Sequence, residues 1–294
     1  MRKRDSAVLL FMGIALVVLV VVLVTGLWLD SSDLSFGMGD RVALVTITGQ
    51  IESSESIVRE IRHWSERSDV AAIVVRLDSP GGGVAASQEI FEEIGKARDK
   101  GKKVVASMGS VAASGAYYIA CAVDTVVANP GTLTGSIGVI MQFPVFEGLM
   151  DKVGVRLETI RSGEFKDVGN PGRAITPREE EMLQSVIDNT YDQFVDVVAE
   201  GRGIARDSVL SFATGAIFTG EQALDLGLVD VLGDYQDAID IAAGMAGLEP
   251  NPRTVRAAAR RRVSWLDLLG SMVGWHWNEN EGTVGPRLAY LFTY

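Results

Sequence analysis

The chain has 294 residues, of which 47% are hydrophobic and 22% charged, and its formal net charge at pH 7 is −11. This length suits one large globular domain or two small ones, and the acidic balance argues against a nucleic-acid partner, because phosphate binding needs concentrated Lys and Arg. The single cysteine, Cys121, excludes an intrachain disulfide and a thiolate cluster. The two histidines, His63 and His276, have no motif around them, so we expect neither a Ser-His-Asp triad nor a bound metal or cofactor.

The N-terminus combines a basic start with a long apolar run. The run over residues 7–29 is long enough, at about 1.5 Å per residue, to cross a hydrocarbon core of about 30 Å. A cleavable secretory signal fits less well, because its apolar region is shorter and ends at a small-x-small site. We therefore expect a transmembrane anchor at 7–29, with the basic residues 1–6 in the cytoplasm and the rest of the chain outside, after a polar linker at 30–39.

After the linker, the hydrophobic pattern predicts alternating strands and helices. Strands are expected at 41–49, 70–78 and 103–109, and helices at 55–67 and 84–99. The strand at 70–78 is apolar and β-branched on both faces, which is typical of a parallel strand covered on both sides. Strand and helix alternating at this spacing indicate βαβ units and an α/β fold.

The second half of the chain is predicted to contain one long helix and several short elements. The long helix is expected at 177–201, with Thr176 as its N-cap and Pro177 in its first turn. Shorter strands and helices are expected around it, at 125–161 and 215–245. From residue 249 to residue 294 the composition becomes basic and aromatic. For this tail we favour a helix packed on its own domain over an interfacial helix on anionic lipid or a contact with a neighbouring subunit.

Two segments could carry chemistry. Ser114 lies between small residues at an expected strand-to-helix junction, directly before Gly115, where unpaired backbone N–H groups can stabilise an oxyanion. Small residues also permit close helix packing, so this segment alone does not distinguish a catalytic role from a packing role. The three glycines at 81–83 lack both the Walker and the dinucleotide-binding patterns. They remain a turn that can bind a peptide backbone or an oxyanion.

A serine nucleophile without histidine needs another base, and lysine is the known substitute. The pKa of such a lysine has to fall from about 10.4 to about 7 or 8, which calls for an apolar or glycine-rich setting. Lys166, in SGEFKDVGNP, ranks first by this criterion, although Glu164 and Asp167 are close in sequence.

Taken together, five segments resemble the signal peptide peptidase SppA family. They are SPGGG at 79–83, GSVAASGAYYIA at 109–120, TGSIGV at 134–139, EFKDVGNP at 164–171 and FTGEQALDLGLVD at 218–230. The resemblance covers about residues 40–245, and the order of serine before lysine fits the short, single-copy form of the family. It implies a ClpP/crotonase-like α/β fold of repeated ββα units over 40–248, preceded by one transmembrane helix.

The resemblance also implies roles for single residues. Ser114 would be the nucleophile, Lys166 the general base and Ser136 the residue that orients the lysine. Gly83 and Gly115 would donate to the oxyanion, with the choice within 81–83 left open. Ser110 is expected to be dispensable for bond cleavage.

At the level of the whole protein, the resemblance implies a membrane-anchored serine endopeptidase with a Ser-Lys dyad. It would degrade cleaved signal peptides and similar hydrophobic peptides at the outer face of the cytoplasmic membrane, contact lipid through its anchor and form a ring, often an octamer. Two alternatives stay open: a SohB- or stomatin-associated type of protease with another membrane-protein substrate, and a catalytically silent scaffold of the same fold. A crotonase-type hydratase is disfavoured by the anchor and by the Ser-Lys pair.

Overall fold

The computed structural model describes residues 41–257, Leu16 and residues 289–291. The chain divides into two units, residues 1–39 and residues 40–294. Apart from Leu16, the anchor predicted at 7–29 and the linker at 30–39 lie outside the described residues. Among the helices that are described, none has the length and apolar character needed to cross a membrane.

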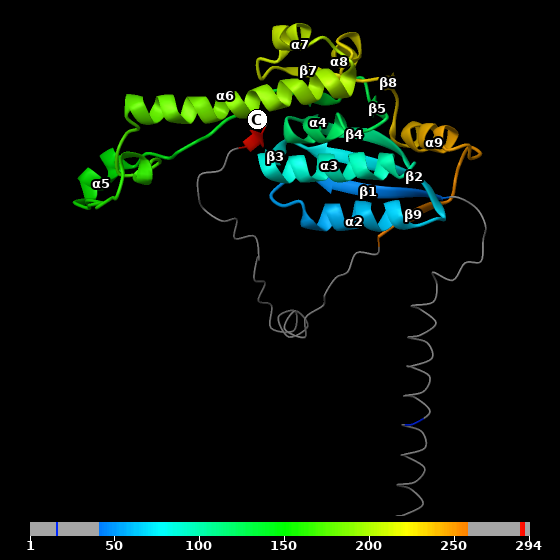
Figure 1. Ribbon diagram of the computed structural model, residues 1–294, viewed down its shortest axis with the longest axis horizontal. Helices are drawn as coiled ribbons and strands as arrows, with labels where there is room; N and C mark the ends of the chain where they lie inside the picture. The colour runs from blue at the N-terminus through cyan, green and yellow to red at the C-terminus, as the bar shows by residue number, and fades with distance from the viewer. Residues whose placement is uncertain (1–15, 17–40, 258–288, 292–294) are drawn as a thin grey trace, which may run out of the picture. The chain divides into compact units, whose positions relative to one another are not determined.

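The second unit is built on a mostly parallel sheet (Figure 1). Its centre consists of β1 (Arg41–Thr48), β2 (Val70–Ser79) and β4 (Lys103–Ala113), with β2 between the other two. The strand order is β7-β6-β4-β2-β1-β9, and β5 and β8 extend the sheet from β4. Only β6 and β7 pair antiparallel among the strands described in this sheet. The α/β class predicted from the sequence is confirmed.

Both faces of the central strands are covered. On one face α2 (Glu55–Glu66), α3 (Val84–Asp99) and α4 (Gly115–Ala120) pack over Val45, Ile73 and their neighbours. On the other face α9 (Tyr235–Met245) packs over a second core that includes Val74. This double burial explains the continuous apolar run of β2, because neighbouring residues of a strand point to opposite faces.

The remaining elements follow in the second half of the chain. They are β5 (Thr125–Ala128), β6 (Leu133–Gly135), α5 (Glu147–Val153), the short 3₁₀ helix η2 (Glu164–Asp167), α6 (Pro177–Arg202), α7 (Arg206–Phe212), β7 (Ile217–Thr219), α8 (Gly220–Asp225) and β8 (Val231–Leu232). The predicted start of the long helix is confirmed, because the Thr176 hydroxyl accepts a hydrogen bond from the Glu179 N–H at 3.3 Å.

Two local predictions differ from the structure. The glycines at 81–83 form a short strand, β3 (Gly81–Gly83), which lies outside the main sheet. In the tail, the helix that we favoured is wrong for Thr254–Arg256, which form β9 parallel to β1, with Val255 packed against the core. Residues 258–288, which hold most of the predicted tail helix, lie outside the described residues.

The segment that follows Ser114 is part of the core. Tyr117 is fully buried, and its hydroxyl donates to the Leu228 carbonyl at 3.0 Å. Burial raises the pKa of the Cys121 thiol to about 12, which fits a packing role.

Candidate active site

Ser114 connects the end of β4 to the start of α4 in an unusual backbone conformation. Its φ is 55° and its ψ is −117°, a region that non-glycine residues rarely adopt and that costs roughly 1–3 kcal/mol. The residue is 1% exposed. Its N–H donates to the Gly135 carbonyl at 2.8 Å, and its carbonyl accepts from the Tyr118 N–H at 2.8 Å. These bonds hold the strained turn in place.

Ser136 lies beside Ser114 because the two serines follow paired residues of neighbouring strands. In the parallel ladder between β4 and β6, Ala113 is opposite Gly135, and each serine is the next residue along its strand. Ser136 also has a positive φ, 51°, is 7% exposed, and donates its N–H to the Ala216 carbonyl at 2.8 Å. The fold therefore brings together two predicted site residues that are far apart in the sequence.

The glycine strand β3 changes the choice of oxyanion donor. The Gly83 N–H, our first candidate, already donates to the Ile51 carbonyl at 2.8 Å, and the Gly81 carbonyl accepts from the Ile51 N–H at 2.9 Å. Backbone groups alternate in direction along a strand, so the N–H and carbonyl of Gly82 point to the opposite side. A Cβ on Gly82 would lie 2.2 Å from the Ile51 oxygen, which explains the glycine.

Gly115 remains a candidate donor. It is the first residue of α4, and the N–H groups of a first helical turn have no acceptor within the helix. Gly115 follows Ser114 directly, and the oxyanion role of its N–H stays a prediction.

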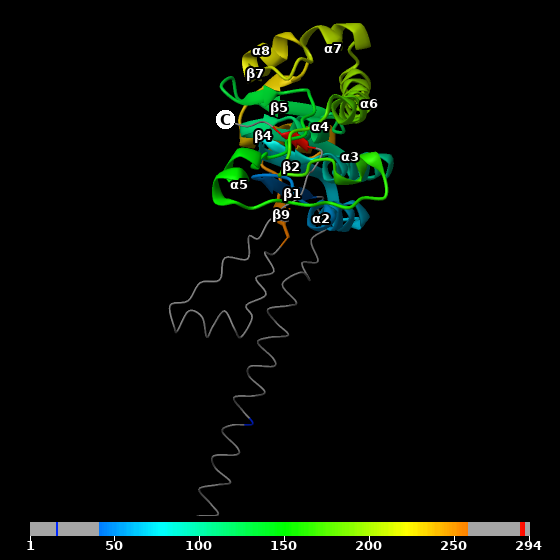
Figure 2. The same ribbon diagram turned by 90° about the vertical axis from the view of Figure 1, so that its left-hand side faces the viewer.

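Lys166 lies in a different part of the molecule. It is an exposed residue of η2, within residues 140–175, a segment that we call the arm and that also contains α5. Figures 1 and 2 show α5 projecting from the body of the sheet, away from α4. In the described part of the chain, no hydrogen bond or ion pair joins Lys166 to either serine. One chain therefore does not bring the predicted dyad together.

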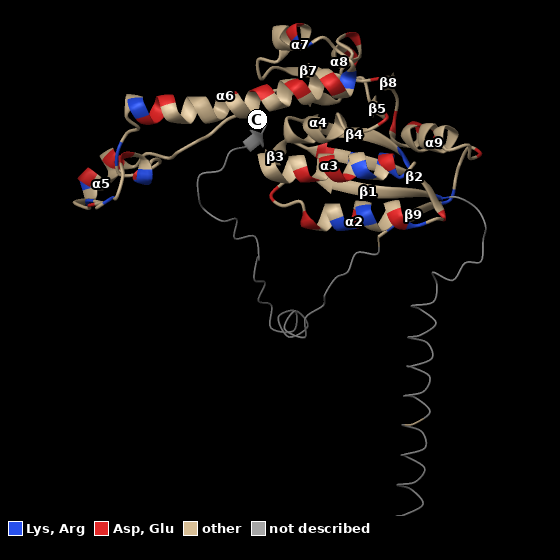
Figure 3. Ribbon diagram, viewed as in Figure 1, with Lys and Arg blue, Asp and Glu red and all other residues tan. Residues whose placement is uncertain are grey.

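The acidic neighbours of Lys166 are bound to arginines, and acidic and basic residues both occur along the segment around α5 (Figure 3). Asp167 binds Arg173, at 3.0 Å, and Arg161, and hydrogen bonds from these two guanidinium groups lower the pKa of Asp167 to about 2. Glu164 binds Arg178 at 2.9 Å. The sequence raised the possibility that these acids point into the site, and the structure gives each of them another partner.

Arg173 also ties the arm to the start of α6. Its guanidinium donates to the Glu179 carboxylate at 2.7 Å as well as to Asp167. The Arg173 hydrogen bonds, together with those from the Thr176 backbone and side chain, lower the pKa of Glu179 to about 2. This cluster of bonds joins η2 to the first turn of α6.

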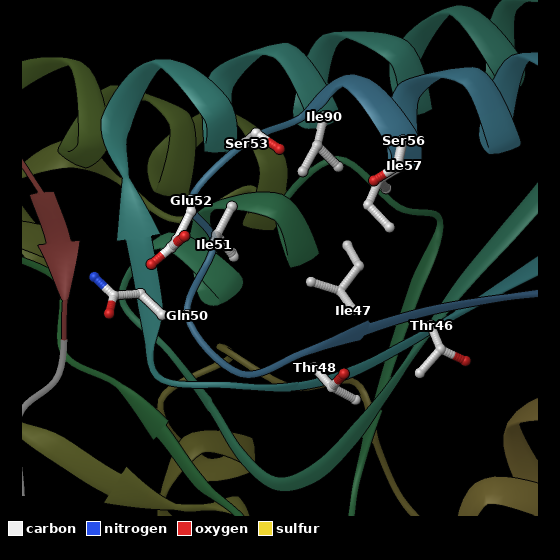
Figure 4. A pocket seen from close by; sticks show the side chains of 10 residues that line it. All are labelled: Thr46, Ile47, Thr48, Gln50, Ile51, Glu52, Ser53, Ser56, Ile57 and Ile90. Atoms are coloured by element: carbon white, nitrogen blue, oxygen red, sulfur yellow. The ribbon is translucent and has the colours of Figure 1, made fainter. Parts of the chain in front are cut away.

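A pocket of about 530 Å³ opens next to β3, and sequence reasoning missed it. Its lining comes from the end of β1, from the loop that carries Ile51, from the first turn of α2 and from Ile90 of α3 (Figure 4). Because Ile51 pairs with Gly82, this pocket borders the glycine strand on the side that Ile51 occupies. Within residues 41–257, no group of three or more His, Cys, Asp or Glu side chains is placed to hold a metal ion.

Comparison with known proteins gives a consistent family. The model of peptidase family S49 matches residues 96–249. "Putative protease slr0021" of Synechocystis sp. is 45% identical over 213 residues, which are 72% of this chain and 76% of that relative. "Protease 4" of Haemophilus influenzae is 31% identical over 79% of this chain but only 38% of its own length. A solved structure of a membrane-bound stomatin-specific protease is 19% identical, with a TM-score of 0.48, over 75% of this chain and 98% of that chain.

Proposed function

Because the chain belongs to peptidase family S49, we propose that it is a serine endopeptidase with a Ser114–Lys166 dyad, anchored in the membrane by residues 7–29. The observation that carries the proposal is the geometry at Ser114. A buried serine with a strained backbone, next to a second serine and followed by a free helix N-terminus, is arranged for nucleophilic attack.

The proposed mechanism assigns one role to each of these groups. Lys166 takes the proton of the Ser114 hydroxyl, and the Ser114 oxygen attacks the carbonyl carbon of a peptide bond. The N–H groups of Gly82 and Gly115 stabilise the oxyanion. Among the three glycines at 81–83, we choose Gly82 as the donor in place of Gly83. The C–N bond then breaks as Lys166 returns the proton to the leaving amine, and water, activated by the same lysine, hydrolyses the acyl-enzyme. Ser136 orients the lysine through its hydroxyl.

The exposed arm supports the proposal of an oligomer. Several large apolar side chains on the arm face solvent in the single chain, among them Leu149 (60% exposed), Val153 (65%) and Ile160 (103%). Exposed apolar surface on this scale is typical of interfaces between proteins. We propose that copies of the chain form a ring such as an octamer, and that packing of the arm in this ring brings Lys166 to a serine.

The substrates that we propose are cleaved signal peptides and other hydrophobic peptides, bound in extended form at the outer face of the cytoplasmic membrane. A membrane-anchored protease with its domain on that side meets such peptides as they leave the bilayer. A SohB- or stomatin-associated type of protease would have a different membrane-protein substrate. The chain would then cleave that membrane protein in place of a signal peptide.

The test is hydrolysis of a synthetic signal peptide by the full-length protein in detergent. Ser114→Ala is expected to lower kcat/KM by on the order of 10³-fold or more, because it removes the nucleophile. Ser110→Ala is the matched control, since Ser110 is an exposed residue of the same strand, and it should retain parental activity. Equal activity of Ser114→Ala and the parent protein would refute the assignment. An inactive parent protein would favour the silent scaffold.

A further inference from the structure

A short segment of the chain runs alongside the glycine strand on the side of the pocket. The Ile51 N–H donates to the Gly81 carbonyl at 2.9 Å, and the Ile51 carbonyl accepts from the Gly83 N–H at 2.8 Å. These two bonds form a parallel bridge between Ile51 and Gly82. Residues 50–52 therefore lie beside β3 as a neighbouring strand would.

The side chains of this segment point to two different faces, because side chains alternate along an extended backbone. Ile51 is 4% exposed and belongs to the core, whereas Gln50 and Glu52 are exposed. Figure 4 shows the polar ends of Gln50 and Glu52 directed toward β3, while Ile51 points into the pocket. Among the described residues that line the pocket, Glu52 is the only charged one, and it forms no ion pair with any of them. Its carboxylate is therefore available to a cation.

The other side of β3 is the edge on which the proposed substrate lies. A strand occupies this edge in the structure and gives the register: β10 (Ala289–Leu291) is antiparallel to β3, with Ala289 opposite Gly83. Opposite residues of paired strands share a face. Glu52 and Gly83 also share a face, because each lies one residue beyond the bridged pair. A peptide residue opposite Gly83 therefore projects on the same face as Glu52.

No side chain of β3 lies between Glu52 and such a peptide residue, because β3 consists of glycine alone. Two strand spacings, about 10 Å, separate the two backbones. A long side chain with a terminal positive charge can cross the bare glycine backbone, with its apolar stem over the glycines and its charged end at the carboxylate. A short side chain leaves the distance open, and an acidic one is repelled. The arrangement therefore favours Lys or Arg in the peptide.

We propose that Glu52 is a specificity-determining residue, which selects peptides with Lys or Arg at the position opposite Gly83. The inference rests on the proposed function, because it takes the edge of β3 as the place where substrate lies. Cleaved signal peptides supply such a residue, since a basic segment precedes their apolar run. The pair is exposed to solvent, so the expected preference is modest, about 5-fold, and should weaken as salt is added.

The first test measures binding to the full-length chain with Ser114→Ala, which cannot cleave by the proposed mechanism. The probes are two fluorescein-labelled peptides with the sequence of residues 286–294, PRLAYLFTY, one carrying Ala289→Lys and the other Ala289→Met. Met keeps an apolar stem without the charge. Because β10 occupies the same edge against both probes, the ratio of their affinities reports the charge alone. We expect the Lys probe to bind about 5-fold more tightly than the Met probe.

Glu52→Gln keeps the size of the side chain and removes its charge, so the two probes should then bind equally. Glu55→Gln is the matched control, because Glu55 is an exposed acid in the first turn of α2, outside the segment that pairs with β3. It should keep the 5-fold ratio. An unchanged ratio in Glu52→Gln would overturn the proposal. So would equal losses of the ratio in Glu52→Gln and Glu55→Gln, and so would the failure of both probes to bind.

The second test separates this proposal from the proposed function. With Ser114 present, the preference for the Lys peptide should appear in kcat/KM and should fall toward 1 in about 0.5 M NaCl, where the Debye length is about half its physiological value. An active protein without a preference that depends on Glu52 would refute the role of Glu52 and leave the protease assignment intact. An inactive protein that keeps this preference in binding would do the reverse.

Discussion

The serine end of the sheet and the arm differ in how their site residues are held. Ser114 and Ser136 are buried, each has a positive φ, and each backbone N–H donates to a carbonyl of a neighbouring element at 2.8 Å. Lys166 is exposed on η2, and ion pairs such as Arg173–Glu179 join the segment around it to the start of α6. The proposed nucleophile is thus positioned by the core of one chain, whereas the proposed base is carried by a surface segment.

The difference in how the two parts are held determines which contacts an active site needs. Backbone strain at Ser114 can persist because the surrounding sheet determines the conformation. The arm has no comparable core, since α5 contains no buried residue. An active site assembled from these two parts therefore depends on whatever packs against the arm.

After removal of the nucleophile, the largest effect should come from removing the base. Lys166→Met keeps the length and apolar stem of the side chain and is expected to lower kcat by about 10²- to 10³-fold, the usual contribution of a general acid–base group. Lys152→Met is the control, because Lys152 is an exposed lysine of α5 on the same arm, and its kcat should stay within about twofold of the parent. A loss of equal size in both variants would show that the arm needs its charge and that Lys166 has no specific role.

Mixing two kinds of inactive chain would show whether Ser114 of one chain works with Lys166 of another in the oligomer. Because Lys166 does not contact Ser114 in its own chain, we expect a mixture of Ser114→Ala and Lys166→Met chains to recover part of the parental activity. A mixture that stays inactive after subunit exchange would place both dyad residues in the same chain.

Some of these features could be predicted from the sequence and others could not. Hydrophobic periodicity located β1, β2 and α6 within a residue or two, because these elements are long and bury whole faces. The proximity of Ser114 and Ser136 could not come from periodicity, because it depends on the parallel register of β4 and β6. Only the family resemblance linked these two serines.

Short and non-local pairings were beyond the sequence. Choosing Gly82 over Gly83 needs the hydrogen bond between Gly83 and Ile51, and backbone bonds leave no trace in a run of three glycines. Strands of three residues, such as β9 and β10 (Ala289–Leu291), are too short to show a period. Their conformation depends on pairing with a distant strand, which the sequence pattern does not reveal. The sequence pattern of the tail therefore favoured a helix.

A smaller effect should follow from changes at Ser136. Losing a hydrogen bond to a charged group costs about 1.5–3 kcal/mol, so Ser136→Ala is expected to lower kcat by about 10- to 100-fold with little change in KM. Ser136→Gly removes the same hydroxyl but relieves the positive φ of 51°. If the hydroxyl orients Lys166, both variants should lose the same activity. Full activity in Ser136→Gly alone would mean that the backbone conformation matters and the hydroxyl does not.

The smallest effect concerns the attachment of the arm and is read from the titration of Asp167. The pKa values of Asp167 and Glu179 are lowered to about 2, chiefly by hydrogen bonds from Arg173, so these carboxylates bind fewer protons in the folded arm than in an unfolded chain. Their contribution to stability is therefore complete above about pH 5 and is lost as the pH falls towards 2. In Arg173→Gln the main donor is gone, and carboxyl ¹³C NMR should place the Asp167 midpoint closer to its ordinary value near 4. Arg178→Gln is the control, since Arg178 binds the half-exposed Glu164 and should leave the Asp167 midpoint near 2. An Asp167 midpoint that is the same in the parent and in Arg173→Gln would mean that Arg173 does not bind Asp167, and this ion pair would then fail as the counterpart of the buried bonds around Ser114.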